Sequence, residues 1–332
     1  MPIQIGGTDT KAIADRFAEA TDLIASEFKS LNRHEQYRSA FARLTKWDPL
    51  CRVHMMGTDQ RDLFVPLVRR LAGEIVQPAG VLLDIGCGDG QTFGLIADAI
   101  APGTTVSYAD PNPEYVSSYG RAVDGSGLVR GAALVAGFDE VDDASKCSGT
   151  CLPPEGSVDL VLALHMIYFL PDLEASLRRM YRFLRPGGAM VIIVADESVA
   201  YTGMALEACA ERLGSRCDGL VSRQRAAIDE RRRLFGGNLI PLLANAVPGS
   251  EPALEIVSQP TRLYGHTISD IVALANIAML MEFDDLAKFE AVSDFLQRTP
   301  ERVDLRIEDA GPRLGMLSVA QPQTIVIVRR TS

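Results

Sequence analysis

The segment 81–90 constrains this chain more than any other part of it. It reads Val-Leu-Leu-Asp-Ile-Gly-Cys-Gly-Asp-Gly, a short apolar run that ends in an acid and closely spaced glycines. The apolar run predicts a buried strand, and the glycines predict a turn whose backbone can lie close to a bound nucleotide. Helical sequence follows from Thr92 to about Ile100. The segment therefore predicts a strand, a loop and a helix that bind a nucleoside-like ligand.

Two details of this loop limit the class of ligand that it can bind. A dinucleotide-binding turn places a third glycine in Gly-x-Gly-x-x-Gly, and counting from Gly86 that position is Gln91. A nicotinamide-dependent oxidoreductase is therefore disfavoured. Asp84 enters the loop and Asp89 lies within it, and carboxylates suit a ligand with a cationic amino-acid end better than a pyrophosphate. Asp110, at the end of the next expected strand, can accept hydrogen bonds from both ribose hydroxyls of an adenosine.

Apolar runs and helical segments alternate along most of the chain. Strands are predicted at 104–109, 132–136, 158–164, 189–195, 254–258 and 324–328, and helices at 11–30, 62–75 and about 268–295. Asp172 is expected to begin a helix with an apolar face, and Pro186-Gly187-Gly188 is expected to stop it. Strands that are apolar on both faces and separated by helices indicate an α/β protein with a parallel sheet covered on both sides.

The same pattern gives the expected domain organisation. Residues 1–58 are predicted to form an N-terminal helical cap segment. Residues 59–199 and 250–332 are predicted to form the sheet-containing core, and 200–249 a helical insertion that acts as a lid.

Charge and cysteine usage limit the partners. The formal net charge is −10, so nucleic acid is not expected as a partner, and the dense basic run Arg231-Arg232-Arg233 is expected to face solvent. No apolar stretch has the length of a membrane span, and no secretion signal is evident. The six cysteines are scattered, which favours reduced thiols, a cytoplasmic protein and no metal site. The oligomeric state is left open.

Five segments together resemble the class I S-adenosylmethionine-dependent methyltransferases: 81–90, 109–111, 136–139, 159–171 and 184–195. The resemblance implies a Rossmann-like sheet of seven strands with the last one antiparallel, and S-adenosylmethionine as the cofactor. It implies that the cofactor is bound by Asp84, Gly86, Cys87, Gly88, Asp110, Pro111, Gly137, Phe138, Leu164 and His165. Asp110 would hold the ribose, and Gly137 and Phe138 would flank the adenine.

A narrower resemblance is to the histamine N-methyltransferase-like group. It rests on His34, Tyr37 and Phe41 in the N-terminal helix, on 110–114, on 165–170 and on 315–328. Three positions depart from that group. Leu50, with Asp48 nearby, stands where the group has an amine-binding acid, His165 replaces a glutamine, and Ala320-Gln321 occupies the place of an asparagine. Histamine itself is therefore not the expected acceptor.

Methyl transfer from a sulfonium is an in-line displacement, so the main task of the protein is to orient the two reactants. His165 is the candidate general base, because imidazole titrates near neutral pH; alternatively it only shapes the pocket. Tyr37, Trp47, Tyr168 and Phe169 are candidate acceptor contacts, with ordinary core packing as the alternative. The sequence predicts methyl transfer to a nitrogen or oxygen of a small metabolite or natural-product intermediate. A protein that binds S-adenosylmethionine without catalysis, as a regulator or scaffold, stays open as the alternative.

Overall fold

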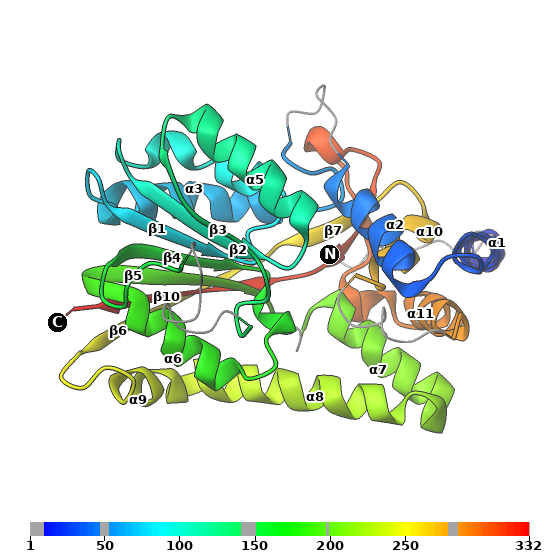
Figure 1. Ribbon diagram of the computed structural model, residues 1–332. Coiled ribbons are helices and arrows are strands. Elements are labelled where there is room, and N and C mark those ends of the chain that lie inside the picture. Colours follow the sequence, from blue (N-terminus) through cyan, green and yellow to red (C-terminus); the bar gives the residue numbers. More distant parts are fainter. Residues whose placement is uncertain (1–9, 47–52, 141–150, 197–198, 278–284, 332) are drawn as a thin grey trace. The chain divides into compact units, whose positions relative to one another are not determined.

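The computed structural model describes residues 10–46, 53–140, 151–196, 199–277 and 285–331 (Figure 1). The chain packs into two compact units. The sheet unit comprises Leu63–Ala195, Glu230–Gln259 and Gln323–Ser332, and the helical unit comprises Met1–Asp62, Asp196–Asp229 and Pro260–Pro322. The chain passes from one unit to the other at 62/63, 195/196, 229/230, 259/260 and 322/323.

A seven-stranded sheet forms the centre of the sheet unit, with strand order β3-β2-β1-β4-β5-β10-β6. Its strands are β1 (Val81–Ile85), β2 (Thr105–Asp110), β3 (Val129–Val135), β4 (Val158–Leu164), β5 (Leu184–Ala195), β6 (Pro252–Gln259) and β10 (Gln323–Arg330). Strands β1 to β5 pair in parallel, whereas β10 is antiparallel to both of its neighbours, β5 and β6. The expected Rossmann-like sheet of seven strands with an antiparallel last strand is confirmed.

Helices cover both faces of this sheet (Figure 1). Leu82 of β1 belongs to the core that α3 (Gln60–Ile75), α4 (Gln91–Gly94) and α5 (Pro113–Ser126) close. Its neighbour Leu83 belongs to the core on the other face, which α6 (Leu173–Phe183) and α9 (Leu239–Ala244) close. Because successive side chains of a strand point to opposite faces, a strand buried on both sides is apolar at most of its positions. This explains the continuous apolar runs in the sequence.

Helix α6 begins where the sequence predicts and ends earlier. Asp172 caps it by accepting the Ala175 N–H at 2.9 Å. The helix ends at Phe183, and Pro186–Gly188, which were expected to stop it, lie inside β5. The reason is that Leu184 already has an extended backbone and is the strand partner of Val158. The helix expected from Thr92 to Ile100 is likewise shorter: α4 is followed by a separate 3₁₀ turn at Ala97–Ala99.

The helical unit has its own core and a small sheet. Its helices are α1 (Thr10–Phe28), α2 (Arg33–Thr45), α7 (Tyr201–Leu213), α10 (Ile268–Leu274), α11 (Ala287–Arg298) and the first part of α8 (Asp218–Arg233). The sheet has the order β7-β9-β8, with β7 (Arg262–Gly265), β8 (Arg306–Ile307) and β9 (Leu317–Ala320). Phe28 and Phe289, whose ring centroids lie 5.0 Å apart, join α1 to α11 in the core.

This division differs from the expected boundaries. Residues 260–322 were expected in the core with the large sheet, but they belong to the helical unit. The physical reason is that β7, β8 and β9 pair with one another, while α10 and α11 pack on α1. The expected insertion 200–249 is also divided, since 200–229 lie in the helical unit and 230–249 in the sheet unit. A lid or cap role for these helices stays a prediction.

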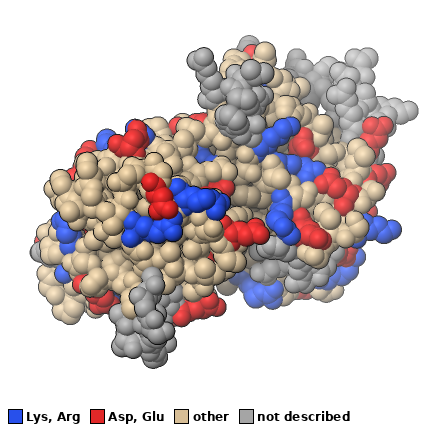
Figure 2. Space-filling view, turned by 45° about the horizontal axis from the view of Figure 1, so that its top comes forward, with Lys and Arg blue, Asp and Glu red and all other residues tan. Residues whose placement is uncertain are grey.

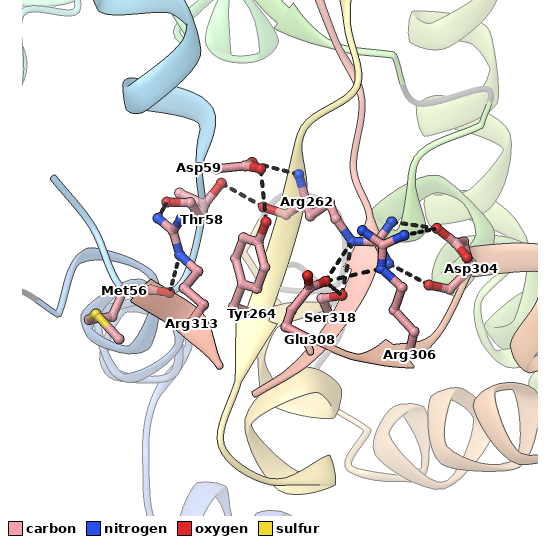
Figure 3. A network of polar contacts seen from close by, with 10 residues as sticks. All are labelled: Met56, Thr58, Asp59, Arg262, Tyr264, Asp304, Arg306, Glu308, Arg313 and Ser318. Atoms are coloured by element: carbon pink, nitrogen blue, oxygen red, sulfur yellow. Dashed lines mark hydrogen bonds and ion pairs between the residues drawn. The ribbon is translucent and has the colours of Figure 1, made fainter. Parts of the chain in front are cut away.

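A charged cluster fixes the small sheet of the helical unit (Figure 3). Arg313, which is 8% exposed, donates to the backbone oxygens of Met55, Met56 and Thr58, and to Asp62 at 2.9 Å. We call this cluster the charged clamp; it consists of Met56, Thr58, Asp59, Arg262, Tyr264, Asp304, Arg306, Glu308, Arg313 and Ser318.

The clamp also uses the buried Arg262. Its side chain donates to Ser318 Oγ at 2.9 Å and to both a carboxylate and a backbone oxygen of Asp304. Asp59 accepts the Arg262 backbone N–H at 2.7 Å and the Tyr264 hydroxyl at 2.8 Å. Burial raises the pKa of Asp59, although these hydrogen bonds oppose the rise. The groups of the clamp satisfy one another, as a structural role requires.

The basic run at the end of α8 is only partly solvated. Arg231 is 7% exposed, and its guanidinium lies 5.3 Å from the ring centroid of Tyr168, so the expectation of a solvent-facing run is wrong for this residue. Arg233 pairs with Glu174 at 2.6 Å. On the face shown in Figure 2, the described basic and acidic side chains are interspersed. In the part of the chain that the structure describes, no helix is both long and apolar enough to span a membrane.

Candidate active site

The loop after β1 requires glycine because of its backbone angles and, at Gly86, because there is no room for a side chain. Gly86, Gly88 and Gly90 have φ angles of 64°, 61° and 87°, a region that other residues seldom adopt. The N–H groups of Gly86 and Cys87 both donate to the Ala109 oxygen, at 2.8 and 3.1 Å, which ties the loop to β2. A Cβ on Gly86 would lie 2.5 Å from the Met166 Cβ, whereas a Cβ on Gly88 would meet nothing within 4 Å. Gly86 is enclosed, and Gly88 borders open space.

Asp110 supports the loop and keeps acceptor capacity. One of its carboxylate oxygens accepts the Gly88 N–H at 3.1 Å, and the other accepts the Asn112 N–H at 2.9 Å. A carboxylate can accept about four hydrogen bonds, so two further donors can be accommodated. Burial raises the pKa of this carboxyl, and the two backbone donors oppose the rise. Asp110 can therefore accept the two hydroxyls of a ribose while holding the loop.

Asp84 lies in β1, two residues before Gly86. It is 5% exposed and accepts the Tyr119 hydroxyl at 2.7 Å. Burial raises the pKa of Asp84 to about 7, the Tyr119 hydrogen bond lowers it, and the neighbouring Asp110 raises it further. Burial beside these two carboxylates also raises the pKa of the Cys87 thiol well above its usual range, which agrees with a filling role and not a nucleophilic one.

His165 follows β4 with an unusual backbone. Its φ is 56°, in the left-handed region, and its N–H donates to the Ile193 oxygen at 2.9 Å. The Phe64 ring lies 6.0 Å from the imidazole, centroid to centroid. Leu164 is half-buried beside it. Because β1, β2 and β4 are adjacent, Leu164 and His165 share the carboxyl-terminal edge of the sheet with the glycine loop and Asp110, the edge where ligands bind in such folds.

Both ring nitrogens of His165 have partners within the sheet unit. Nδ1 lies 3.5 Å from the Tyr168 hydroxyl oxygen, and Nε2 lies 3.2 Å from Gln323 Oε1. Gln323 Nε2 donates to Gln259 Oε1 at 2.6 Å, and Gln259 Nε2 donates to the Leu63 oxygen at 3.1 Å. At the other end, the Tyr168 oxygen accepts the Ala195 N–H. We call Tyr168, His165, Gln323 and Gln259 the relay.

Of the two predicted adenine contacts, Gly137 and Phe138, the Phe138 side chain is buried. Phe138 is 3% exposed, with its ring centroid 6.4 Å from that of Phe183 and 4.7 Å from the Arg179 guanidinium. The Gly137 N–H donates to Glu140 at 3.0 Å. Pro111 is exposed after β2. Contact of these three residues with a ligand stays a prediction.

The predicted acceptor contacts fall into three groups. Tyr168 and Phe169 lie in the sheet unit, with rings 6.3 Å apart, and Phe169 is 58% exposed. Tyr37 lies in the helical unit, where it stacks on Phe41 at 5.6 Å. Trp47 lies outside the described residues, as do Asp48 and Leu50.

Tyr119, Gln259 and Gln323 also contribute to this site, although no motif in the sequence marks them. Gln259 ends β6 and Gln323 begins β10, and the two residues face each other only because these strands pair antiparallel, which the sequence does not show.

Comparisons with known proteins agree with this geometry. The profile of a family described as "Methyltransferase domain" matches residues 56–233, more than half of the chain. The chain belongs to this methyltransferase family. Membership confirms the expected methyltransferase class and S-adenosylmethionine as its methyl donor.

Curated relatives match over part of their length. A nocamycin O-methyltransferase of Saccharothrix syringae is 34% identical over 38% of this chain and 42% of its own. A ubiquinone/menaquinone biosynthesis C-methyltransferase of Xanthomonas campestris is 31% identical over 38% of this chain and 46% of its own. The chain thus spans about half the length of these relatives.

A solved structure of a protein from Bacillus halodurans, described as a candidate methyltransferase, covers 80% of this chain and 98% of its own, with 14% identity and a TM-score of 0.46. That likeness is too low to bear on function.

Proposed function

We propose that this protein transfers the methyl group of S-adenosylmethionine to a nitrogen or oxygen of a small metabolite or natural-product intermediate. The observation that carries the proposal is the Gly86–Gly88 turn beside Asp110, at the carboxyl-terminal edge of the sheet in a methyltransferase-family chain. A relative named for O-methylation of nocamycin supports oxygen as the atom and a natural product as the acceptor class.

The residues at this edge fit the donor. Open space borders Gly88, where a Cβ would meet nothing within 4 Å, and Asp110 retains room for two hydroxyl donors. Gly86 and Gly88 would therefore lie under the methionine part and Asp110 would hold the ribose, while Asp84, which enters the loop, accepts the Tyr119 hydroxyl. When bound, S-adenosylmethionine supplies an electrophilic methyl group on a cationic sulfonium.

The chain's own contribution is orientation and the exclusion of water. A well-oriented pair of reactants can lower the barrier by roughly 7–11 kcal/mol, so no acid–base group is required when the acceptor arrives as a free nucleophile. Tyr168 and Phe169 after β4 are the candidate acceptor contacts in the sheet unit, and the Phe169 ring is exposed. Tyr37 and Trp47 remain candidate contacts from the helical unit.

The likeness to histamine N-methyltransferases belongs to the proposal only as a class of acceptor. Gln321, near the asparagine position of that group, is 4% exposed. Its amide accepts the Thr202 N–H at 3.1 Å and donates to the Thr202 hydroxyl at 2.9 Å. Since Gln321 is engaged in these contacts, histamine is not the expected acceptor, and the amine panel includes other amines besides histamine.

The test is a methyl-transfer screen. The full chain is incubated with S-adenosylmethionine and a panel of phenols, carboxylates and amines, and methylated products are identified by mass spectrometry together with released S-adenosylhomocysteine. We expect product formation that depends on the acceptor. Donor binding without product across the whole panel would favour the non-catalytic alternative.

A further inference from the structure

We propose that Gln259, Gln323 and Tyr168 are positioning residues that hold His165 as a neutral imidazole with its hydrogen on Nε2. In that state both ring nitrogens are occupied, and the ring serves the reaction as a fixed wall of the site and not as the proton acceptor. The hydrogen position is a property of the ligand-free chain, and only its catalytic consequence rests on the proposed function.

The far end of the relay fixes the direction of every bond up to the imidazole. The Leu63 backbone oxygen can only accept, so Gln259 must turn its NH₂ group toward it, at 3.1 Å. The oxygen of Gln259 then faces Gln323, which must present its own NH₂ at 2.6 Å. The oxygen of Gln323 is therefore left facing His165 Nε2 at 3.2 Å. An acceptor at this distance requires that Nε2 carry the hydrogen.

The Tyr168 end of the relay independently places the hydrogen on Nε2. The Ala195 backbone N–H can only donate, and the Tyr168 oxygen accepts it. This favours turning the Tyr168 hydrogen toward His165 Nδ1, 3.5 Å from its oxygen, where an unprotonated nitrogen can accept it. A hydrogen on Nδ1 would instead oppose that donor.

The backbone of His165 restricts the ring further. The left-handed φ of 56° and the N–H bond to Ile193 fix the point from which the side chain leaves the sheet. Phe64, which is 3% exposed, packs near one side of the imidazole. The ring is thus held by backbone, packing and both nitrogens, and taking a substrate proton on Nδ1 would reverse the bond with Tyr168.

The relay also occupies a distinctive place in the chain. Leu63, Ala195, Gln259 and Gln323 are each the first or last residue of a sheet-unit segment, at four of the five points where the chain changes unit. A single row of hydrogen bonds therefore joins four of these connections through the imidazole. This explains why residues with no sequence proximity, such as Gln259 and Tyr168, share one network.

The hydrogen position can be read directly by two-bond ¹⁵N–¹H correlation spectra of ¹⁵N-histidine-labelled protein. The chain has four histidines, and loss of one signal set in H165Q assigns His165. We expect the Nε2–H pattern in the wild type and in the single variants Q259L and Y168F, because either end of the relay suffices. In the double variant Q259L/Y168F the Nδ1–H form should rise from undetectable to a share comparable with the other form.

The matched control is S258A/Y168F, since Ser258 is exposed on β6 next to Gln259 and belongs to no part of the relay. It should keep the Nε2–H pattern. A wild type that shows Nδ1–H or a doubly protonated ring overturns the proposal, as does a double variant Q259L/Y168F that keeps the wild-type pattern.

A kinetic arm tests the catalytic consequence with any acceptor found in the screen. The amide of H165Q can still donate to Gln323, so we expect its kcat to exceed that of H165A by about tenfold, whereas loss of a general base would lower both alike, by roughly 10²–10⁴-fold. Equal large losses would overturn the wall role. Absence of turnover in the wild type would count against the proposed function and leave the spectroscopic result standing.

Discussion

The charged clamp of the helical unit and the relay of the sheet unit both join distant segments through polar side chains, the clamp with charged groups and the relay with amide, imidazole and hydroxyl groups. In both networks some of these side chains are buried, and Figure 3 shows the clamp. In the clamp each arginine meets several acceptors; Arg313 alone bonds to three backbone oxygens and one carboxylate. In the relay the bonds connect hydroxyl, imidazole and amide groups one after another.

The difference predicts where sensitivity lies. A guanidinium has five donors in a fixed fork, so a single arginine of the clamp makes several stabilising hydrogen bonds. Because it can only donate, the direction of these hydrogen bonds cannot reverse. A row of amides, imidazole and hydroxyl takes one hydrogen-bond direction as a whole, so changes at both of its ends, Gln259 and Tyr168, together alter the hydrogen position on His165. The clamp is therefore expected to control stability, and the relay to control the state of one imidazole.

The largest expected effect comes from the clamp. Arg313→Met should lower the free energy of unfolding by about 3–5 kcal/mol, because it leaves the partly buried Asp62 carboxylate and three backbone carbonyls without the donor that they share. Urea unfolding followed by circular dichroism measures it. A loss as small as that of an exposed ion pair would mean that the clamp carries little of the stability.

Asp84 offers an intermediate case, a buried carboxyl whose hydrogen-bond donor is neutral. Its pKa is raised from 3.8 to about 7, chiefly by burial, so the folded protein binds a proton that the unfolded chain releases. The stabilisation is complete below the unfolded value and is lost as pH rises through the folded one. D84N, which keeps an oxygen for Tyr119, should equal the wild type near about pH 4 and exceed it by roughly 2–4 kcal/mol above about pH 7.

Paired urea titrations of the wild type and D84N across this pH range give the difference in stability. A difference that does not change with pH would show that Asp84 titrates alike in the folded and unfolded states.

The relay should contribute less to stability. Tyr168→Phe removes one hydroxyl that bonds to Ala195 and His165 and should cost about 1 kcal/mol in urea unfolding. A loss equal to that of R313M would contradict the contrast between the two networks.

The smallest effect is expected at the exposed margin of the clamp. The Arg306 side chain is 43% exposed and pairs with Glu308 at 3.1 Å. R306M should change the free energy of unfolding by about 0–1 kcal/mol, as is usual for exposed ion pairs. It serves as the matched control for R313M, and a larger loss would place the strength of the clamp at its surface.

Much of the fold could be predicted because local physics determines it. The apolar runs gave all seven strands of the large sheet, and Asp172 marked the start of α6. The small sheet was missed because β8 has two residues and β7 and β9 have four each, too few to show a period. Its membership in the helical unit depends on pairing between segments more than 40 positions apart.

Some residues of the site could be predicted from the sequence and others could not. The glycines and Asp110 could be found because the turn requires their chemistry at one place in the chain. Gln259 and Gln323 could not, because a glutamine at a strand end is ordinary and its role arises only when β6, β10 and the loop after β4 come together. Asp84 was found, but its burial under the Tyr119 hydroxyl follows from α5 packing, which the sequence does not show.

The central claim is that the loop after β1 and Asp110 bind S-adenosylmethionine, with Asp110 at the ribose, and calorimetric titration tests it most directly. We expect the wild type to bind S-adenosylmethionine and not NAD, and D110A to bind it more weakly by roughly 1–3 kcal/mol. The control D98A removes a carboxylate whose side chain is 71% exposed and should bind like the wild type. Binding of NAD without S-adenosylmethionine, or equal affinity of D110A and the wild type, would contradict the account.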